Sequence, residues 1–411
     1  MNLDIDFVRS NFPAFSEPSL QGQAFFENAG GSYACTQVIE RLQSYYTQTK
    51  VQPNYPYPAS ELAGELMDSS YSSLANYLNV KPDEIHIGPS TTQNVYVLAQ
   101  AFRGYLKAGD AIIVTNQDHE ANSGAWRRLA DIGVEVLEWR VDATGSLRLE
   151  DLQELLKQEP KLVCFPHCSN IIGEINPVKE VSEAAHEVGA LSVVDGVSYA
   201  GHGFPNVADL GADLYMFSSY KTYGPHQGVM VVRDRVMDKL ENQSHYFNDG
   251  YIHKRLVPAG PDHAQVAALQ GVTQYFDALH AHHFETDTQK KPEQIHDLLR
   301  RAELERLEPL LDYLKNHPKL RIIGPDSLDP DDLESRAPTI SLLAEGHSPE
   351  ALAKRLAQRG VMCGYGHFYA ARLLDALGID VSTGVLRLSF VHYTSEEELE
   401  QLMNALDKVL G

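Results

Sequence analysis

The sequence predicts an α/β fold in which a mainly parallel, seven-stranded sheet forms a large domain and a small α+β domain lies at the C-terminus. Three observations carry this prediction: short continuous apolar runs, helical stretches between them, and a change of pattern after residue 260. Continuous apolar runs are typical of parallel strands buried on both faces, and intervening helices cover those faces. The 411 residues are enough for two or three domains.

The strands expected in the large domain are short runs rich in Val, Ile and Leu. They occupy 84–88, 111–115, 134–139, 161–166, 191–195, 214–218 and 229–232. Apolar residues at helical spacing predict helices over 91–106 and 178–189. The last two strands are separated mainly by a turn, so one edge of the sheet is expected to run antiparallel.

After residue 260 the pattern changes to two long helical runs, at 264–284 and 291–316. The later elements are strands at 320–324, 339–344 and 385–390, a polar loop at 325–338, a helix at 348–359 and a final helix from about 395. We therefore expect an N-terminal segment (1–20) that packs with the small domain, a large domain (21–285) and the small domain itself (286–411).

Composition excludes several classes of protein. The formal net charge of −22 disfavours nucleic acid and anionic membranes as partners. No apolar stretch approaches the roughly 20 residues that a membrane helix needs, and the N-terminus lacks the pattern of a secretory signal. The four cysteines form no CxxC pair, and the histidines of "HAHH" (280–283) have no acidic or cysteine partner at ligand spacing. We expect a cytoplasmic protein without a metal site.

Polar side chains come directly after several of the predicted strands. They are Thr91 and Thr92 after "EIHIGPS", His119 after "AIIVTNQD", Asn170 after "KLVCFPHCS", Asp195 at the end of "LSVVD" and Lys221 after "LYMFSS". Each has an ordinary explanation by itself, such as a helix cap or a turn residue. Ligands of parallel α/β sheets, however, bind beyond the carboxyl ends of the strands, so the joint placement predicts one site.

This set of residue types suits pyridoxal 5'-phosphate. The aldehyde of that cofactor needs a lysine amine, and its ring nitrogen needs a carboxylate that keeps it protonated. An imidazole can cover one face of the ring. The phosphate needs hydroxyl groups and the amides of a helix N-terminus, which "PSTTQN" would offer.

The chain resembles the class V aminotransferase superfamily of fold type I and, within it, the cysteine desulfurase-like branch. The resemblance rests on seven motifs in the family's order: "FFENAGGS" (25–32), "GPSTTQNV" (88–95), "DHEANSGAW" (118–126), "HCSNIIGEINPV" (167–178), "VVDGVSYAGH" (193–202), "FSSYKTYGPHQGV" (217–229) and "VLRLSFVHYTSEEEL" (385–399). It implies a homodimer with its active site near the subunit interface and a large domain that binds the cofactor.

The resemblance also implies roles for individual residues. The catalytic residues would be Lys221, which bonds the cofactor and moves the Cα proton, Asp195 at the ring nitrogen and His119 on the ring face. The cofactor would further be held by Thr91, Thr92 and Ser218 at the phosphate and by Asn170 at the phenolic oxygen. Tyr220, which can still offer the phosphate a hydroxyl, and Ser198, near the phenolic oxygen, stand where the family usually has a histidine and a glutamine. The substrate would be held by Arg387, as a bidentate carboxylate anchor, by Asn170 and by His367.

One departure from the desulfurase pattern bears on the reaction. Persulfide-forming relatives carry a nucleophilic cysteine shortly before the arginine, where this chain has Phe368 or Tyr369. Cys363 lies six residues before Tyr369, in a predicted strand start, and reads as a buried structural thiol. We therefore expect β-elimination or C–S lyase chemistry on cysteine or a cysteine derivative. The alternatives are an aminotransferase, an epimerase, a persulfide-forming desulfurase and a cofactor-binding protein without turnover.

Overall fold

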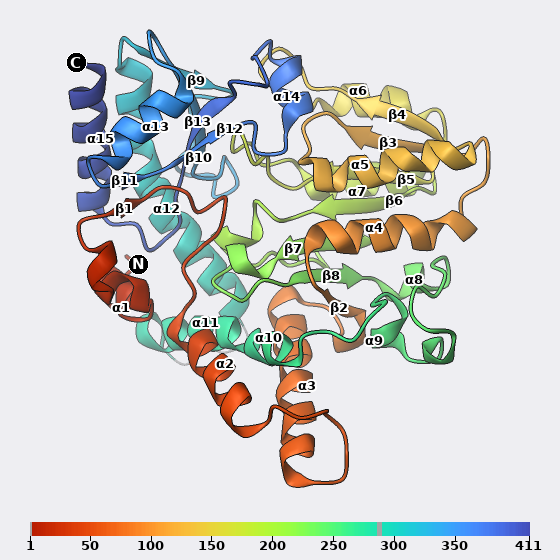
Figure 1. Ribbon diagram of the computed structural model, residues 1–411. Coiled ribbons are helices and arrows are strands. Elements are labelled where there is room, and N and C mark those ends of the chain that lie inside the picture. Colours follow the sequence, from red (N-terminus) through yellow and green to blue (C-terminus); the bar gives the residue numbers. More distant parts are fainter. Residues whose placement is uncertain (1, 286–289) are drawn as a thin grey trace.

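The computed structural model describes residues 2–285 and 290–411. Its central sheet has the strand order β2-β8-β7-β6-β5-β3-β4 (Figure 1). The strands are β2 (Ile85–Gly88), β3 (Ala111–Thr115), β4 (Glu135–Trp139), β5 (Leu162–Pro166), β6 (Leu191–Asp195), β7 (Leu214–Ser218) and β8 (Gly228–Val232). Only β8 runs against its neighbours within this sheet. The predicted α/β fold with a mainly parallel sheet is confirmed, and the reversed strand lies one position inside the edge.

Helices cover both faces of this sheet because alternate residues of each strand point to opposite sides. Ile112 and Cys164 belong to the core under α4 (Thr91–Ala101) and α5 (Gly124–Arg127), which Figure 1 shows along one face. Ile113 and Val163 belong to the core on the other face. The helices that contribute to this second core include α2 (Thr36–Gln48), α3 (Pro58–Leu78), α6 (Leu149–Leu156), α7 (Val178–Glu187), α10 (His263–Ala268) and α11 (Gln270–His283).

A second, antiparallel sheet has the order β12-β13-β10-β9. Its strands are β9 (Leu320–Ile323), β10 (Thr339–Ala344), β12 (Gly364–Gly366) and β13 (Val385–Ser389). Residues of β9, β10 and β13 share a core with α12 (Lys291–Asn316), α13 (Pro349–Ala357) and α15 (Glu396–Leu410). The helical run predicted at 264–284 is two helices, α10 and α11, with Leu269 between them. The other elements are α1 (Ile5–Ser10), α8 (Asp234–Met237), α9 (Ile252–Arg255), α14 (Ala371–Ala376), β1 (Ala24–Phe25) and β11 (Val361–Met362).

The N-terminal part of the chain contacts both the unit built around the central sheet and the C-terminal unit built around the antiparallel sheet. Strand β1 pairs with β11 in parallel, and Arg9 donates to the Glu398 carboxylate of α15 over 2.7 Å. Asp4, however, accepts a hydrogen bond from His282 at the end of α11. The division at residues 20 and 285 therefore stays a prediction, and residues 286–289, which begin the predicted small domain, lie outside the described residues. Among the described residues no helix is long and apolar enough to cross a membrane.

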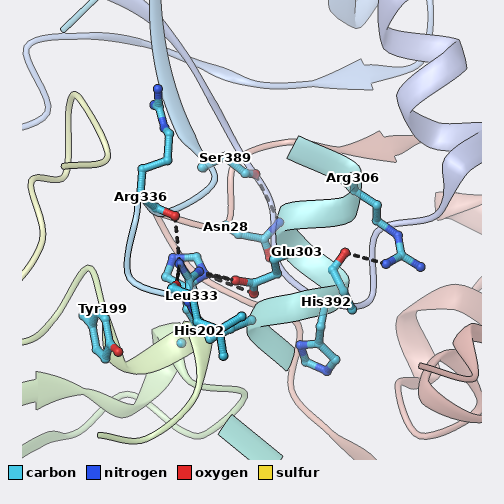
Figure 2. Close-up of polar contacts among 12 residues, drawn as sticks. Asn28, Tyr199, His202, Glu303, Arg306, Leu333, Arg336, Ser389 and His392 are labelled. Carbon is cyan, nitrogen blue, oxygen red and sulfur yellow. Dashed lines mark hydrogen bonds and ion pairs between the residues drawn. The ribbon is translucent and has the colours of Figure 1, made fainter. Parts of the chain in front are cut away.

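A buried ionic cluster joins the two units (Figure 2). Glu303 of α12 has a fully buried side chain and binds Nδ1 of His202 at 3.0 Å and Arg300 at 2.9 Å. The Arg300 guanidinium also donates to the carbonyl oxygens of Leu333 and Arg336. His202 lies seven residues after Asp195, so this cluster fixes the chain that leaves the end of β6 against the C-terminal unit.

Candidate active site

The carboxyl ends of the parallel strands and the N-terminus of α4 surround one cavity, as expected for a ligand site of an α/β sheet. Nine of the eleven residues that the sequence predicts for the site line it: Thr91, Thr92, His119, Asn170, Asp195, Ser198, Ser218, Tyr220 and Lys221. Arg387 and His367 are not among its lining residues. The cavity therefore unites residues that lie up to 130 positions apart (221 − 91).

Lys221 ends the 3-10 turn that comes after β7. Burial and the nearby Arg387 charge lower the pKa of its amine to about 8, because both disfavour the ammonium form. The negative charge of Asp195 acts in the opposite direction. A lysine with such a pKa holds a useful fraction of neutral amine near neutral pH, which nucleophilic and proton-transfer chemistry both need.

Asp195 ends β6, and only 5% of its surface is exposed. Its Oδ1 accepts a hydrogen bond from the Val197 amide at 2.9 Å. Burial raises the pKa of this carboxyl to about 6, against the opposing effects of the Val197 amide and the Lys221 charge. A buried carboxyl of this kind gains from a cationic partner such as a protonated ring nitrogen.

Hydroxyl groups gather at the N-terminus of α4. Thr91 Oγ1 and Ser218 Oγ lie 2.8 Å apart, and Ser90 caps the helix by accepting from the Gln93 amide. Thr92 and Tyr220 also line the cavity here. Free amides and the positive end of the helix dipole make such a place suitable for a phosphate.

His119 and Asn170 face the cavity from the loops after β3 and β5. His119 Nδ1 accepts from the Ala121 amide at 3.0 Å, and burial is the main cause that lowers the pKa of His119 to about 3, so its ring is neutral. Asn170 Nδ2 donates to the Phe368 carbonyl at 2.9 Å, whereas its Oδ1 is buried without a partner among the described residues. This unpaired atom, the Asp195 carboxyl and the anion-binding helix end together fit pyridoxal phosphate.

Arg387 lies on β13 and is 2% exposed. Its Nη2 donates to Glu27 Oε1 at 2.6 Å and its Nη1 to the Asn170 carbonyl at 3.1 Å. The guanidinium carbon also lies 3.8 Å from the centre of the Phe368 ring. Burial lowers the pKa of Arg387, and Glu27 counteracts this effect.

Sequence reasoning missed Glu27 as a partner of Arg387, although Glu27 belongs to the "FFENAGGS" motif. It also missed Gln117 and Cys168, which line the cavity. His367 is exposed, and its Nδ1 accepts from the Tyr369 amide at 3.1 Å, within its own turn. Its predicted contact with substrate stays a prediction.

The segment from Cys363 to Tyr369 covers the Arg387 side of the site. Cys363 lies between β11 and β12, and burial raises the pKa of its thiol to about 12. Phe368 and Tyr369 both have left-handed backbone angles, with φ of 46° and 58°. The Tyr369 carbonyl accepts from the Glu120 amide at 2.7 Å, and the Tyr369 ring centre lies 5.2 Å from that of His119.

Comparisons with known proteins agree with this geometry. The chain is 35% identical to the aminotransferase-like protein FGM3 of Gibberella zeae, over 100% of this chain and 99% of that protein. It is 27% identical to the cysteine desulfurase-like protein ustD of Aspergillus flavus, over 99% and 91%. The apo structure of a cysteine desulfurase from Thermococcus onnurineus NA1 superposes with a TM-score of 0.87 at 25% identity and covers 100% of this chain and 98% of that one.

The family described as aminotransferase class-V matches residues 24–402. Members of that family are enzymes that depend on pyridoxal 5'-phosphate. With a match that spans almost the whole chain and a cavity at the strand ends that suits this cofactor, the chain belongs to the class-V aminotransferase family.

Proposed function

We propose that the protein is a pyridoxal-phosphate-dependent enzyme that catalyses β-elimination on cysteine or a cysteine derivative. The observation that supports the proposal most directly is one cavity lined by both the buried Lys221 and the buried Asp195, two residues whose pKa values burial moves to about 8 and about 6. Elimination, transamination and epimerisation all begin with loss of the Cα proton, so the residues around the lysine decide which bond breaks next.

The bound cofactor would supply an aldehyde that bonds the amino group and a ring that accepts carbanion charge. Asp195 would hold the ring nitrogen protonated, and His119, Asn170 and Ser198 would orient the ring. Thr91, Thr92, Ser218 and Tyr220 would hold the phosphate. Lys221 would hold the cofactor until substrate arrives and would then take the Cα proton.

The residues on the Arg387 side support elimination over persulfide formation. A persulfide-forming enzyme needs a thiolate that reaches the substrate sulfur. Cys363 packs against the core of the C-terminal unit, and its raised pKa keeps it a thiol. Phe368 and Tyr369 can neither attack sulfur nor carry it. The leaving group would therefore depart from Cβ as a free thiol or sulfide, and water would hydrolyse the remaining enamine to pyruvate and ammonia.

Product analysis tests the proposal. The holoenzyme is incubated with L-cysteine and with L-cysteine S-conjugates, and products are identified by mass spectrometry. Pyruvate from either substrate supports elimination. Alanine from cysteine would reverse the assignment in favour of a desulfurase. An oxo acid with an intact side chain, or inverted stereochemistry at Cα, would establish the aminotransferase or epimerase alternative.

For the assembly we propose a cytoplasmic homodimer with its active site near the subunit interface. Large aromatic side chains that a monomer leaves in water support this: Tyr246 is 89% exposed, Phe247 63% and Tyr251 60%. Such residues are enriched in protein interfaces. Light scattering on the holoenzyme measures the mass, and a monomer at micromolar concentration would refute the dimer.

A further inference from the structure

Glu27 lies in a turn between the part of the active site that carries Arg387 and the part that carries Lys221. The amide of Asn28 donates to the Ser389 carbonyl at 3.2 Å, two residues beyond Arg387 on β13. Ser32, at the other end of the turn, donates to the Tyr220 carbonyl, one residue before Lys221. The turn 27–32 therefore connects the strand that carries Arg387 with the turn that carries Lys221.

Two glycines make room for the Glu27 side chain. A Cβ at Gly30 would lie 1.9 Å from Glu27 Oε2, and a Cβ at Gly364 would lie 2.9 Å from Glu27 Oε1. Neither glycine has a positive φ, so the backbone conformation does not require glycine at either position. Glycine is instead needed at both positions because a side chain there would occupy the space of the Glu27 carboxylate next to Arg387.

The Glu27 carboxylate is the partner of Arg387 that can leave. The other partners are the backbone carbonyl of Asn170 and the uncharged ring of Phe368. The Glu27 side chain is 29% exposed, whereas that of Arg387 is 3% exposed. Arg387 Nε is buried without a partner among the described residues, so a donor remains for an incoming acceptor.

We propose that Glu27 is an internal placeholder that neutralises Arg387 in the free enzyme and gives way to the α-carboxylate of the substrate. A buried guanidinium without a counter-ion is costly, so the site keeps one carboxylate at all times and exchanges Glu27 for the substrate. The proposal rests on the proposed role of Arg387 as the carboxylate anchor. It makes Glu27 a residue that sets substrate affinity, because each binding event must first break this ion pair.

Calorimetric titration of the holoenzyme with 2-methylalanine tests the exchange. This amino acid carries the ammonium and α-carboxylate groups but no Cα proton, so binding is measured without turnover. The wild type is compared with Glu27→Gln, Glu120→Gln and Arg387→Gln. Glu120 is the matched control, because its exposed ion pair with Arg372 at 3.2 Å puts the same charge near the cavity without a bond to Arg387.

We expect Glu27→Gln to lower the dissociation constant about tenfold, since one charge-assisted bond no longer competes. We expect Glu120→Gln to change it less than about twofold. We expect 2-methylalanine to raise the melting temperature of Glu27→Gln more than that of the wild type, which a purely structural role would not produce. If Glu27→Gln does not fold, Glu27→Asp, whose shorter side chain draws the carboxylate away from Arg387, should shift the constant in the same direction.

The outcomes distinguish a failure of Glu27 as the placeholder from a failure of Arg387 as the carboxylate anchor. An unchanged or weaker affinity in Glu27→Gln overturns the placeholder, and so does an equal gain in Glu120→Gln, which would reflect charge alone. Arg387→Gln should abolish binding. If it binds as the wild type does, the anchoring role of Arg387 fails, whatever the Glu27 variants show.

Discussion

The Lys221 amine and the Asp195 carboxylate line the same cavity from neighbouring strand ends, and burial moves their pKa values toward each other, to about 8 and about 6. Two groups that would ordinarily be fully charged at neutral pH thus both come close to titrating there. This convergence is typical of sites that transfer protons.

Lys221→Ala should remove the absorbance of the imine between the lysine and the cofactor, and all turnover, because no other amine is placed to bond the aldehyde among the residues that line the described cavity. Absorption spectra and pyruvate production measure the two effects. Lys239→Ala, which changes a lysine outside the cavity, is the control. A variant that keeps either the spectrum or turnover would contradict the assignment of Lys221.

Asp195→Asn should stabilise the cofactor-free protein in a pH-dependent manner. The folded pKa of Asp195 is raised above the value of 3.8 expected when unfolded. Its contribution to stability is therefore fully present below pH 4 and lost as the pH rises through about 6. Above pH 7 the free energy of unfolding of the variant should exceed that of the wild type by up to about 3 kcal/mol, whereas at pH 4 the two should differ little. Urea unfolding at both pH values measures this, and an equal gain at both would refute it.

Ser218→Ala should weaken cofactor binding about tenfold, since one charge-assisted hydrogen bond to a phosphate is lost. Equilibrium dialysis of the cofactor measures the change. Ser73→Ala removes a hydroxyl from α3, where it donates to the Ser70 carbonyl, and should leave the affinity unchanged. Binding as tight in Ser218→Ala as in the wild type would exclude Ser218 from the phosphate site.

Cys363→Ser should change turnover of cysteine less than about threefold. The thiol is half-buried, and burial raises its pKa to about 12, so it supplies no thiolate near neutral pH. Initial rates of pyruvate and alanine formation test this. A loss of a hundredfold or more would make Cys363 a nucleophile and restore the desulfurase alternative.

Glu303→Ala should destabilise the fold by roughly 3–5 kcal/mol, because it leaves the buried Arg300 without its carboxylate partner. Denaturant titration gives the difference in free energy of unfolding. Glu350→Ala breaks an exposed pair with Lys354 and should leave the free energy of unfolding nearly unchanged. Equal losses of stability in the two variants would show that the buried ionic cluster around Glu303 stabilises the fold no more than an exposed ion pair does.

Strands and helices with a strong local pattern were predictable from the sequence. The strands β3, β6, β7 and β10 and the helix α12 have the predicted bounds. The interruption at Leu269 was not predictable, since the apolar spacing continues through it. There the packing of α10 against α2 and α3 decides the geometry.

The strand-end residues of the site were predictable because parallel strands end at a common edge, which places Thr91, His119, Asn170, Asp195 and Lys221 together. The ion pair of Glu27 with Arg387 was not. The two residues are 360 positions apart, and one sequence contains no information about how the segment after β1, which carries Glu27, lies beside β13.

The turn 27–32 also orders events during synthesis. Glu27 and Asn28 reach their partners only when Arg387 and Ser389 have emerged from the ribosome, long after the strand ends that form the cofactor cavity. Contacts between residues this far apart in the sequence are also slow to form, because a long loop must close first. In a nascent chain, all the residues that line the cofactor cavity are therefore made before Arg387, the proposed anchor of the substrate carboxylate.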